Sequence, residues 1–180
     1  GIHITVLTAD RLGDRAPEEV VDGVQIIRVP AYPKSSDLYI APKLGQYIAY
    51  EQWDILHVQG YHTFVPPLAM YEARRAKLPY VLTYHSGGNT SGLRNWIRPL
   101  QVKAQRGLYK SAHKLIGVSQ FEADQFRDWL GLPADLFTVV PNGSTLPSLP
   151  DDVPPKDPDS RLILSVGRLE QYKGHHRLIR

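Results

Sequence analysis

The sequence contains no cysteine among its 180 residues. This absence excludes disulfide bonds and metal sites built on thiolate ligands, and it fits a reducing compartment, so we expect a cytoplasmic protein. No apolar stretch approaches the roughly 18 residues that a membrane-spanning helix needs. With 42% hydrophobic and 22% charged residues, the composition is that of an ordinary globular protein.

Acidic residues are missing from one long stretch, although the net charge of the whole chain is only +3. No aspartate or glutamate lies between Glu72 and Glu122. The cations of this stretch are Arg74, Arg75, Lys77, Arg94, Arg98, Lys103, Arg106, Lys110 and Lys114. Such a concentration favours an anionic partner for one face of the molecule.

Four of these cations form a stripe on a helix that the apolar spacing predicts from Trp96 to Ala112 and on the residues that follow it. One interpretation is an ordinary solvated face. The other is attraction to a phosphorylated acceptor or to the anionic inner face of a membrane. The stripe consists of Lys103, Arg106, Lys110 and Lys114.

Strands and helices alternate along the chain with short connections. This order predicts an α/β fold with a doubly wound, parallel, Rossmann-like sheet. The connection around Gly13, Asp14 and Pro17 is too polar and broken for a helix. The predicted strands are Ile2–Thr8, Val24–Val29, Ile55–Val58, Tyr80–Tyr84, Lys114–Val118 and Phe137–Val140. The other predicted helices are Pro42–Gln52, Phe64–Lys77 and one that Ser119 caps and that runs through Trp129.

A proline-rich segment divides the chain into two domains. Residues 1–143 make up the first domain, residues 144–160 form a stiff extended linker with five prolines, and residues 161–180 begin a second domain. The first residues enter a strand at once, and the last residues lie in the first turns of a helix. We therefore expect the natural protein to extend beyond both ends of this chain.

The second domain opens with a candidate anion site. Leu162–Val166 reads as a buried parallel strand, and Gly167 allows a sharp turn at its carboxyl end. Arg168 and Lys173 follow, beside the start of the next helix, where open α/β sheets bind ligands. Two cations at a helix N-terminus suit a phosphate or diphosphate, although two solvated basic residues would give the same pattern.

His85 is the candidate catalytic residue because it follows a predicted strand directly. The carboxyl end of a strand faces the cleft of an open sheet, and a neutral imidazole can both donate to and accept from a ligand hydroxyl. The alternative is a histidine that tethers its loop to the backbone. In that loop, Gly87 and Gly88 either let the backbone approach a ligand or simply make it flexible.

Other histidines carry weaker signals. His57 and His62 do not predict a metal site, because their odd separation points them to opposite faces and no third ligand is near in sequence. Tyr61 and His62 follow the strand that ends at Val58, so they either line the acceptor side of a cleft or belong to an ordinary loop. We expect no metal.

Several motifs in the same order resemble the retaining glycosyltransferases of the GT-B fold, known as group 1 or family 4. The resemblance covers nearly the whole chain, and Gly1–Thr8 is similar to the family's second strand. It implies two Rossmann-like domains, an acceptor domain over residues 1–143 and a donor domain from residue 161. The motifs are Thr83-Tyr84-His85, Ile116–Ser119, Val139–Gly143, Val166–Leu169 and Lys173-Gly174.

The resemblance implies transfer of a sugar from a nucleoside diphosphate sugar to a hydroxyl of a sugar, a lipid-linked or a small-molecule acceptor. Gly167, Arg168 and Lys173 would bind the donor diphosphate and His85 would lie beside the transferred sugar. Fixed cations would stabilise the leaving diphosphate without a metal, and neither a cofactor nor a nucleic acid is expected. Because the family's first strand and most of the donor domain are missing, we expect this chain to fold, to expose an unpaired sheet edge and to be inactive alone.

Three alternatives remain at this point. A nucleotide-sugar epimerase would share the architecture, and a binding module would hold the same ligand without turnover. An NAD-dependent dehydrogenase would use Asp10 to bind the ribose, but nothing later in the chain supplies its chemistry.

Overall fold

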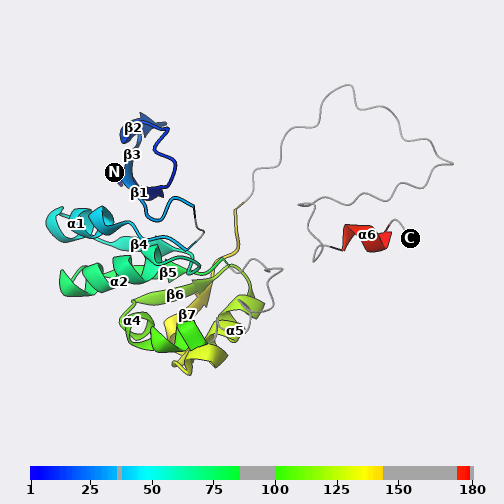
Figure 1. Ribbon diagram of the computed structural model, residues 1–180. Coiled ribbons are helices and arrows are strands. Elements are labelled where there is room, and N and C mark those ends of the chain that lie inside the picture. Colours follow the sequence, from blue (N-terminus) through cyan, green and yellow to red (C-terminus); the bar gives the residue numbers. More distant parts are fainter. Residues whose placement is uncertain (36–37, 86–99, 144–173, 179–180) are drawn as a thin grey trace.

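The computed structural model describes residues 1–35, 38–85, 100–143 and 174–178 (Figure 1). Strands and helices alternate over most of this length, as the sequence predicts. The strands are β1 (Thr5–Asp10), β2 (Glu18–Val21), β3 (Val24–Pro30), β4 (Leu56–Gln59), β5 (Tyr80–Thr83), β6 (Lys114–Gly117) and β7 (Phe137–Val139). The helices are α1 (Pro42–Tyr50), α2 (Val65–Arg75), α4 (Arg106–Lys110), α5 (Gln120–Leu130) and α6 (His175–Leu178), with a 3₁₀ turn η1 (Ala134–Leu136).

The strands form two sheets and not the single sheet that the sequence analysis predicts. One sheet has the order β4-β5-β6-β7 and is entirely parallel, as in a Rossmann-like domain. The other has the order β1-β3-β2, in which β1 and β3 are parallel. Within the described residues, β1 is an edge strand of the smaller sheet and β4 is an edge strand of the larger sheet. No strand pairs with both of them, so the two sheets share no hydrogen-bonded ladder.

The strand β2 is not predicted from the sequence, in which this segment reads as an irregular connection. It pairs antiparallel with β3 through a two-residue turn, with Val21 opposite Val24. Asp22 and Gly23 form the turn with φ angles of 51° and 80°. Positive φ at both central residues is typical of a hairpin turn, for which Asp-Gly is a strong local signal. The segment before this turn is polar and irregular in composition, which is why the sequence did not predict a strand there.

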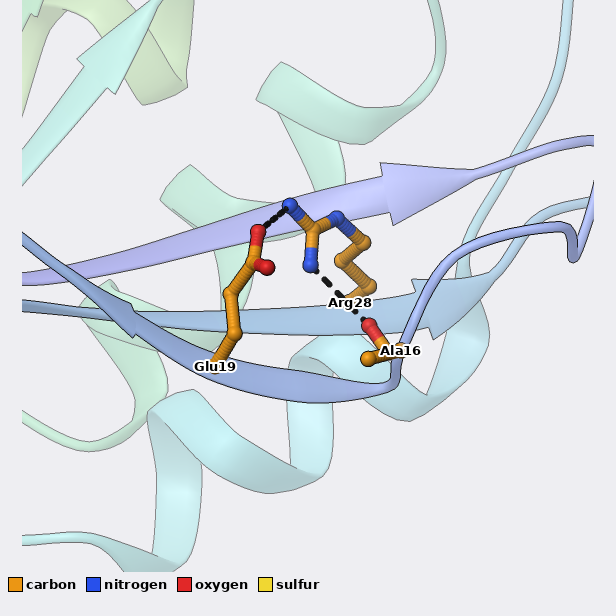
Figure 2. Close-up of polar contacts among 3 residues, drawn as sticks. All are labelled: Ala16, Glu19 and Arg28. Atoms are coloured by element: carbon orange, nitrogen blue, oxygen red, sulfur yellow. Dashed lines mark hydrogen bonds and ion pairs between the residues drawn. The ribbon is translucent and has the colours of Figure 1, made fainter.

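Arg28 of β3 ties this strand to β2 and to the segment that precedes β2 (Figure 2). Its side chain is only 10% exposed and makes an ion pair with Glu19 of β2. The same guanidinium donates a hydrogen bond of 3.0 Å to the carbonyl oxygen of Ala16. A mostly buried arginine needs such partners, because an unpaired charge there would be costly.

One hydrophobic core joins both sheets. It contains Val29 of β3, Leu44 of α1, Met70 of α2 and Leu82 of β5, all nearly or fully buried. Proline residues occupy the first turns of α1 and α2, where a missing backbone N–H costs nothing, and this confirms the predicted helix starts. Figure 1 shows α1 and α2 side by side, with α4 and α5 near the far strands of the larger sheet.

The junction between β6 and α5 agrees closely with the sequence analysis. The hydroxyl of Ser119 accepts from the backbone N–H of Glu122, and the Glu122 carboxylate accepts from the N–H of Val118 at 2.9 Å. A Cβ atom on Gly117 would lie 2.8 Å from the nitrogen of Ala123. Glycine is therefore required where strand and helix approach each other.

The helix predicted from Trp96 to Ala112 is described only from residue 100. Residues 100–104 are helical, Gln105 is a turn residue, and α4 continues to Lys110. No helix in the described part of the chain has the length and apolar character needed to span a membrane. The predicted linker and the strand Leu162–Val166 lie outside the described residues.

Candidate functional site

His85 lies two residues beyond the end of β5, at the carboxyl end of the larger sheet, as the sequence predicts. Its side chain is exposed, and its Nε2 atom lies 2.7 Å from Oε1 of Gln59. Its main chain is held as well, because the Nε2–H of His62 donates to the carbonyl oxygen of His85 at 2.7 Å. The loop after β4 thus fixes the residue after β5.

Polar side chains of β4 and β5 extend this arrangement along the strand ends. His57 and Gln59 alternate on β4 and therefore share a face, and Gln59 lies opposite Thr83 in the parallel register. The Nε2 atom of His57 lies 2.7 Å from Oγ1 of Thr83 and 3.1 Å from the amide nitrogen of Gln59. We call His57, Gln59, Thr83 and His85 the strand-end network.

The surroundings of His57 disfavour its charged form. Partial burial of the imidazole lowers the pKa of His57 from its ordinary 6.5, and electrostatic interaction with the neighbouring His85 ring lowers it further. A neutral imidazole keeps one ring nitrogen as an acceptor, so it can receive the amide hydrogen of Gln59.

An open hollow of about 650 Å³ lies beside the network. Residues from the end of β1, from β3 and from the loop before α2 form its walls, and His62 belongs both to the hollow and to the contact with His85. The lining residues are Thr8, Ala9, Asp10, Arg11, Leu12, Asp14, Arg15, Arg28, Tyr39, His62 and Thr63. The hollow is thus placed at the carboxyl ends of parallel strands, where α/β folds bind ligands.

The walls of the hollow combine charged groups with an aromatic ring. The guanidinium of Arg11 lies 5.6 Å from the ring centre of Tyr39, within the range of a cation–π contact. One carboxylate oxygen of Asp10 accepts from the backbone N–H groups of Leu12 at 3.0 Å and Gly13 at 2.8 Å, which shapes the loop. Donors, acceptors and an apolar ring face on one wall suit a polyhydroxylated ligand.

The structure corrects the expected position of Tyr61. Its ring is 4% exposed and packs edge-on against Phe126, with ring centroids 4.8 Å apart. Tyr61 therefore supports the loop from the core and does not line the hollow, because the aromatic cluster beneath the sheet is a better environment for its ring than water. Only His62 of this predicted pair reaches the hollow.

The predicted basic stripe contains two kinds of cation. Arg106 donates to the carbonyl oxygens of Leu130 at 2.7 Å and Gly131 at 2.9 Å, at the C-terminal end of α5. Lys114 donates to the carbonyl oxygen of Asp135 at 2.5 Å. Lys103 and Lys110 are exposed. Half of the stripe therefore serves the fold, since cations stabilise the free carbonyl groups of a helix end.

Several predicted site residues lie outside the described part of the chain, namely Gly87, Gly88, Gly167, Arg168 and Lys173. Within the described part, no three histidine, aspartate or glutamate side chains gather as they would around a metal ion. The sequence alone does not single out Gln59, the contact of Thr83 with His57, or the place of His57 in the network. The available signal was that His57 and Gln59, two residues apart, share one face of a strand. To place Thr83 beside them, one must also know the register of β4 against β5.

A comparison with known families matches residues 1–143 to the glycosyl transferase 4-like domain. The chain belongs to this family. No curated protein matches the chain. Membership favours a transferase over the dehydrogenase alternative, and the Rossmann-like parallel sheet of this glycosyl transferase 4-like domain fits that assignment. Its hollow and strand-end network lie within the matched residues.

Proposed function

We propose that this glycosyl transferase 4-like protein moves a sugar, with retention of configuration, from a nucleoside diphosphate sugar to a hydroxyl acceptor. The observation that carries the proposal is the position of His85. It lies at the carboxyl end of β5, in a chain of this family, and is linked through His62 to an open hollow. An imidazole at that place can exchange hydrogen bonds with a sugar hydroxyl during transfer.

In this proposal, different residues bind the acceptor and the donor. The acceptor occupies the hollow, where Arg11, Asp10 and Tyr39 offer the mixed polar and aromatic surface that hydroxyl-rich ligands need. Gly167, Arg168 and Lys173 hold the donor diphosphate. Departure of the diphosphate builds negative charge, which fixed cations stabilise without a metal ion.

The test is a transfer assay on the full-length protein with a panel of nucleoside diphosphate sugars, with and without a chelator. The His85→Ala variant should lower transfer about tenfold to a thousandfold, the usual range for losing one precise polar contact. His113→Ala is the matched control, because His113 is exposed and precedes β6 at the opposite end of the sheet. Circular dichroism would verify that both variants fold.

Each rival function has its own outcome in this assay. Formation of an epimer from the nucleotide sugar without acceptor would favour an epimerase. Binding without turnover in the full-length protein would favour a binding module. Equal transfer by wild type and His85→Ala would remove His85 from the reaction.

A further inference from the structure

The contact between Gln59 and His85 joins two side chains from neighbouring strands. Gln59 is the last residue of β4, and His85 stands two residues beyond Thr83, which is the partner of Gln59 in the sheet register. The Oε1 atom of Gln59 lies 2.7 Å from Nε2 of His85. The contact joins the last residue of β4 to a residue two positions beyond the end of β5, so the register of the sheet brings the two side chains together.

The chemistry of the Gln59 amide oxygen and the His85 imidazole decides which of them carries the hydrogen of this contact. A carbonyl oxygen can only accept a hydrogen bond, so Nε2 of His85 must carry a hydrogen. In a neutral imidazole the other nitrogen, Nδ1, then keeps its lone pair. No hydrogen bond joins Nδ1 of His85 to any described residue, and it is therefore the nitrogen that can accept from a ligand.

The orientation of the Gln59 amide is fixed from its other side. Its nitrogen lies 3.1 Å from Nε2 of His57, and His57 is itself 2.7 Å from the hydroxyl of Thr83. Since an amide nitrogen can only donate, Nε2 of His57 is the unprotonated nitrogen of the ring and accepts from the NH₂ group, which leaves the oxygen of Gln59 on the side of His85. His62 completes the frame by binding the main-chain oxygen of His85.

We propose that Gln59 is a positioning residue, which holds the His85 ring with its proton on Nε2 and presents Nδ1 as an acceptor for a substrate hydroxyl. The inference rests on the proposed transfer reaction, in which His85 contacts the sugar. Its consequence is that the ring enters the reaction already oriented, and orientation within a fraction of an ångström is worth a large part of such a contact.

The first arm of the test measures the proton on the ring. Nuclear magnetic resonance of ¹⁵N-labelled histidine distinguishes protonated from unprotonated ring nitrogens, and the His85→Ala spectrum assigns the signals. Wild type and the exposed control Gln52→Leu should show His85 protonated at Nε2. Gln59→Leu removes the acceptor and should give a mixture of both forms. Protonation of wild type at Nδ1, or an unchanged ring in Gln59→Leu, would overturn the proposal.

The second arm measures transfer by the full-length protein. Gln59→Leu should lower kcat about tenfold to a hundredfold with little change in KM, since the ring is misplaced but the hollow is intact. Gln59→Glu keeps an acceptor for Nε2–H, but its carboxylate favours the imidazolium, which has no lone pair on Nδ1. The rise of kcat with pH should therefore move to higher pH in Gln59→Glu and stay in place in Gln52→Glu.

The two arms separate failure of this inference from failure of the proposed function. If wild type transfers no sugar from any donor, the proposed function fails, while the ring protonation still decides whether Gln59 holds His85. If wild type transfers sugar and Gln59→Leu keeps its kcat, or Gln59→Glu keeps the wild-type pH profile, then Gln59 does not position the reacting group.

Discussion

The ring of Tyr84 stacks on the ring of Phe126, with centroids 3.5 Å apart and planes inclined by 10°. Tyr84 is the residue before His85, and Phe126 lies in α5. The stack therefore anchors the chain just after β5 to a helix, and the next side chain, that of His85, is exposed and reaches Gln59. Burial also raises the pKa of Tyr84, so that its hydroxyl stays protonated.

Tyr84→Phe should raise the free energy of unfolding by about 1 kcal/mol, because the buried Tyr84 hydroxyl has no hydrogen-bond partner among the described residues. Tyr109→Phe is the matched control. It removes a hydrogen bond of 3.3 Å to Gln105, and we expect it to lower stability by a similar amount. Urea denaturation of both variants would measure the difference. A loss of stability in Tyr84→Phe would show that the hydroxyl is satisfied in solution.

Gly117→Ala should lower the free energy of unfolding by about 1–3 kcal/mol, because the new methyl group would press on backbone atoms of α5. The nearest of these are the nitrogen of Ala123 at 2.8 Å and the carbonyl oxygen of Ser119 at 3.0 Å. Gly107→Ala should change the free energy of unfolding in the opposite direction. No atom lies within 4 Å of a Cβ at Gly107 in α4, so alanine should stabilise the helix by up to about 1 kcal/mol. Thermal melts that moved both variants the same way would contradict this account.

Stability should fall as the pH drops below about 6.5, in part because of His57. The pKa of His57 is lowered in the folded state, so the unfolded chain binds the proton more readily and stability is lost as pH falls below the ordinary value of 6.5. His57→Gln should flatten this part of the stability–pH curve, whereas the exposed control His113→Gln should not. Denaturation midpoints between pH 5 and pH 8 would decide, and parallel curves for wild type and His57→Gln would refute the assignment.

We propose that Lys103 and Lys110 carry any attraction to an anionic surface, since Arg106 and Lys114 are engaged with backbone carbonyl groups. Replacing both lysines with glutamate should reduce sedimentation with phosphatidylserine vesicles at least about tenfold. Replacing Lys34 and Lys43 with glutamate changes the net charge equally at exposed positions elsewhere. Equal loss in both double variants, or binding that ignores salt and lipid charge, would leave the stripe as a solvated face.

Local patterns made much of the fold predictable from the sequence. Ser119 and Glu122 predict the start of α5, and the prolines after Phe64 predict the start of α2. Both signals can be read from the sequence because helix capping depends on residues close together in the chain. The division into two sheets was not predictable in this way. It depends on which strands meet, and hydrophobic periodicity carries no information about pairing partners.

The candidate site shows the same limit. His85 was predicted because its place after an apolar strand is a local feature. Gln59 is 26 residues away in sequence, and its role depends on the register of β4 against β5 and on the direction of its amide. Two readings of Tyr61, in a cleft or in an ordinary loop, stayed open in the sequence, because a tyrosine after a strand can turn toward solvent or toward the core, where the structure places it.

Because β1 and β4 do not pair, the two sheets can differ in their resistance to local unfolding. In the described part of the chain, the smaller sheet is joined to the larger one by side-chain packing through residues such as Val29 and Leu44 and not by a ladder of hydrogen bonds. Units without shared ladders can unfold separately, at less than the global free energy. The loop that carries Arg11 and Arg15 belongs to the smaller sheet, and its amides should exchange with solvent before those of β5. The wall of the hollow would thus be the part of the domain that unfolds first, while β5, which leads to His85, stays folded.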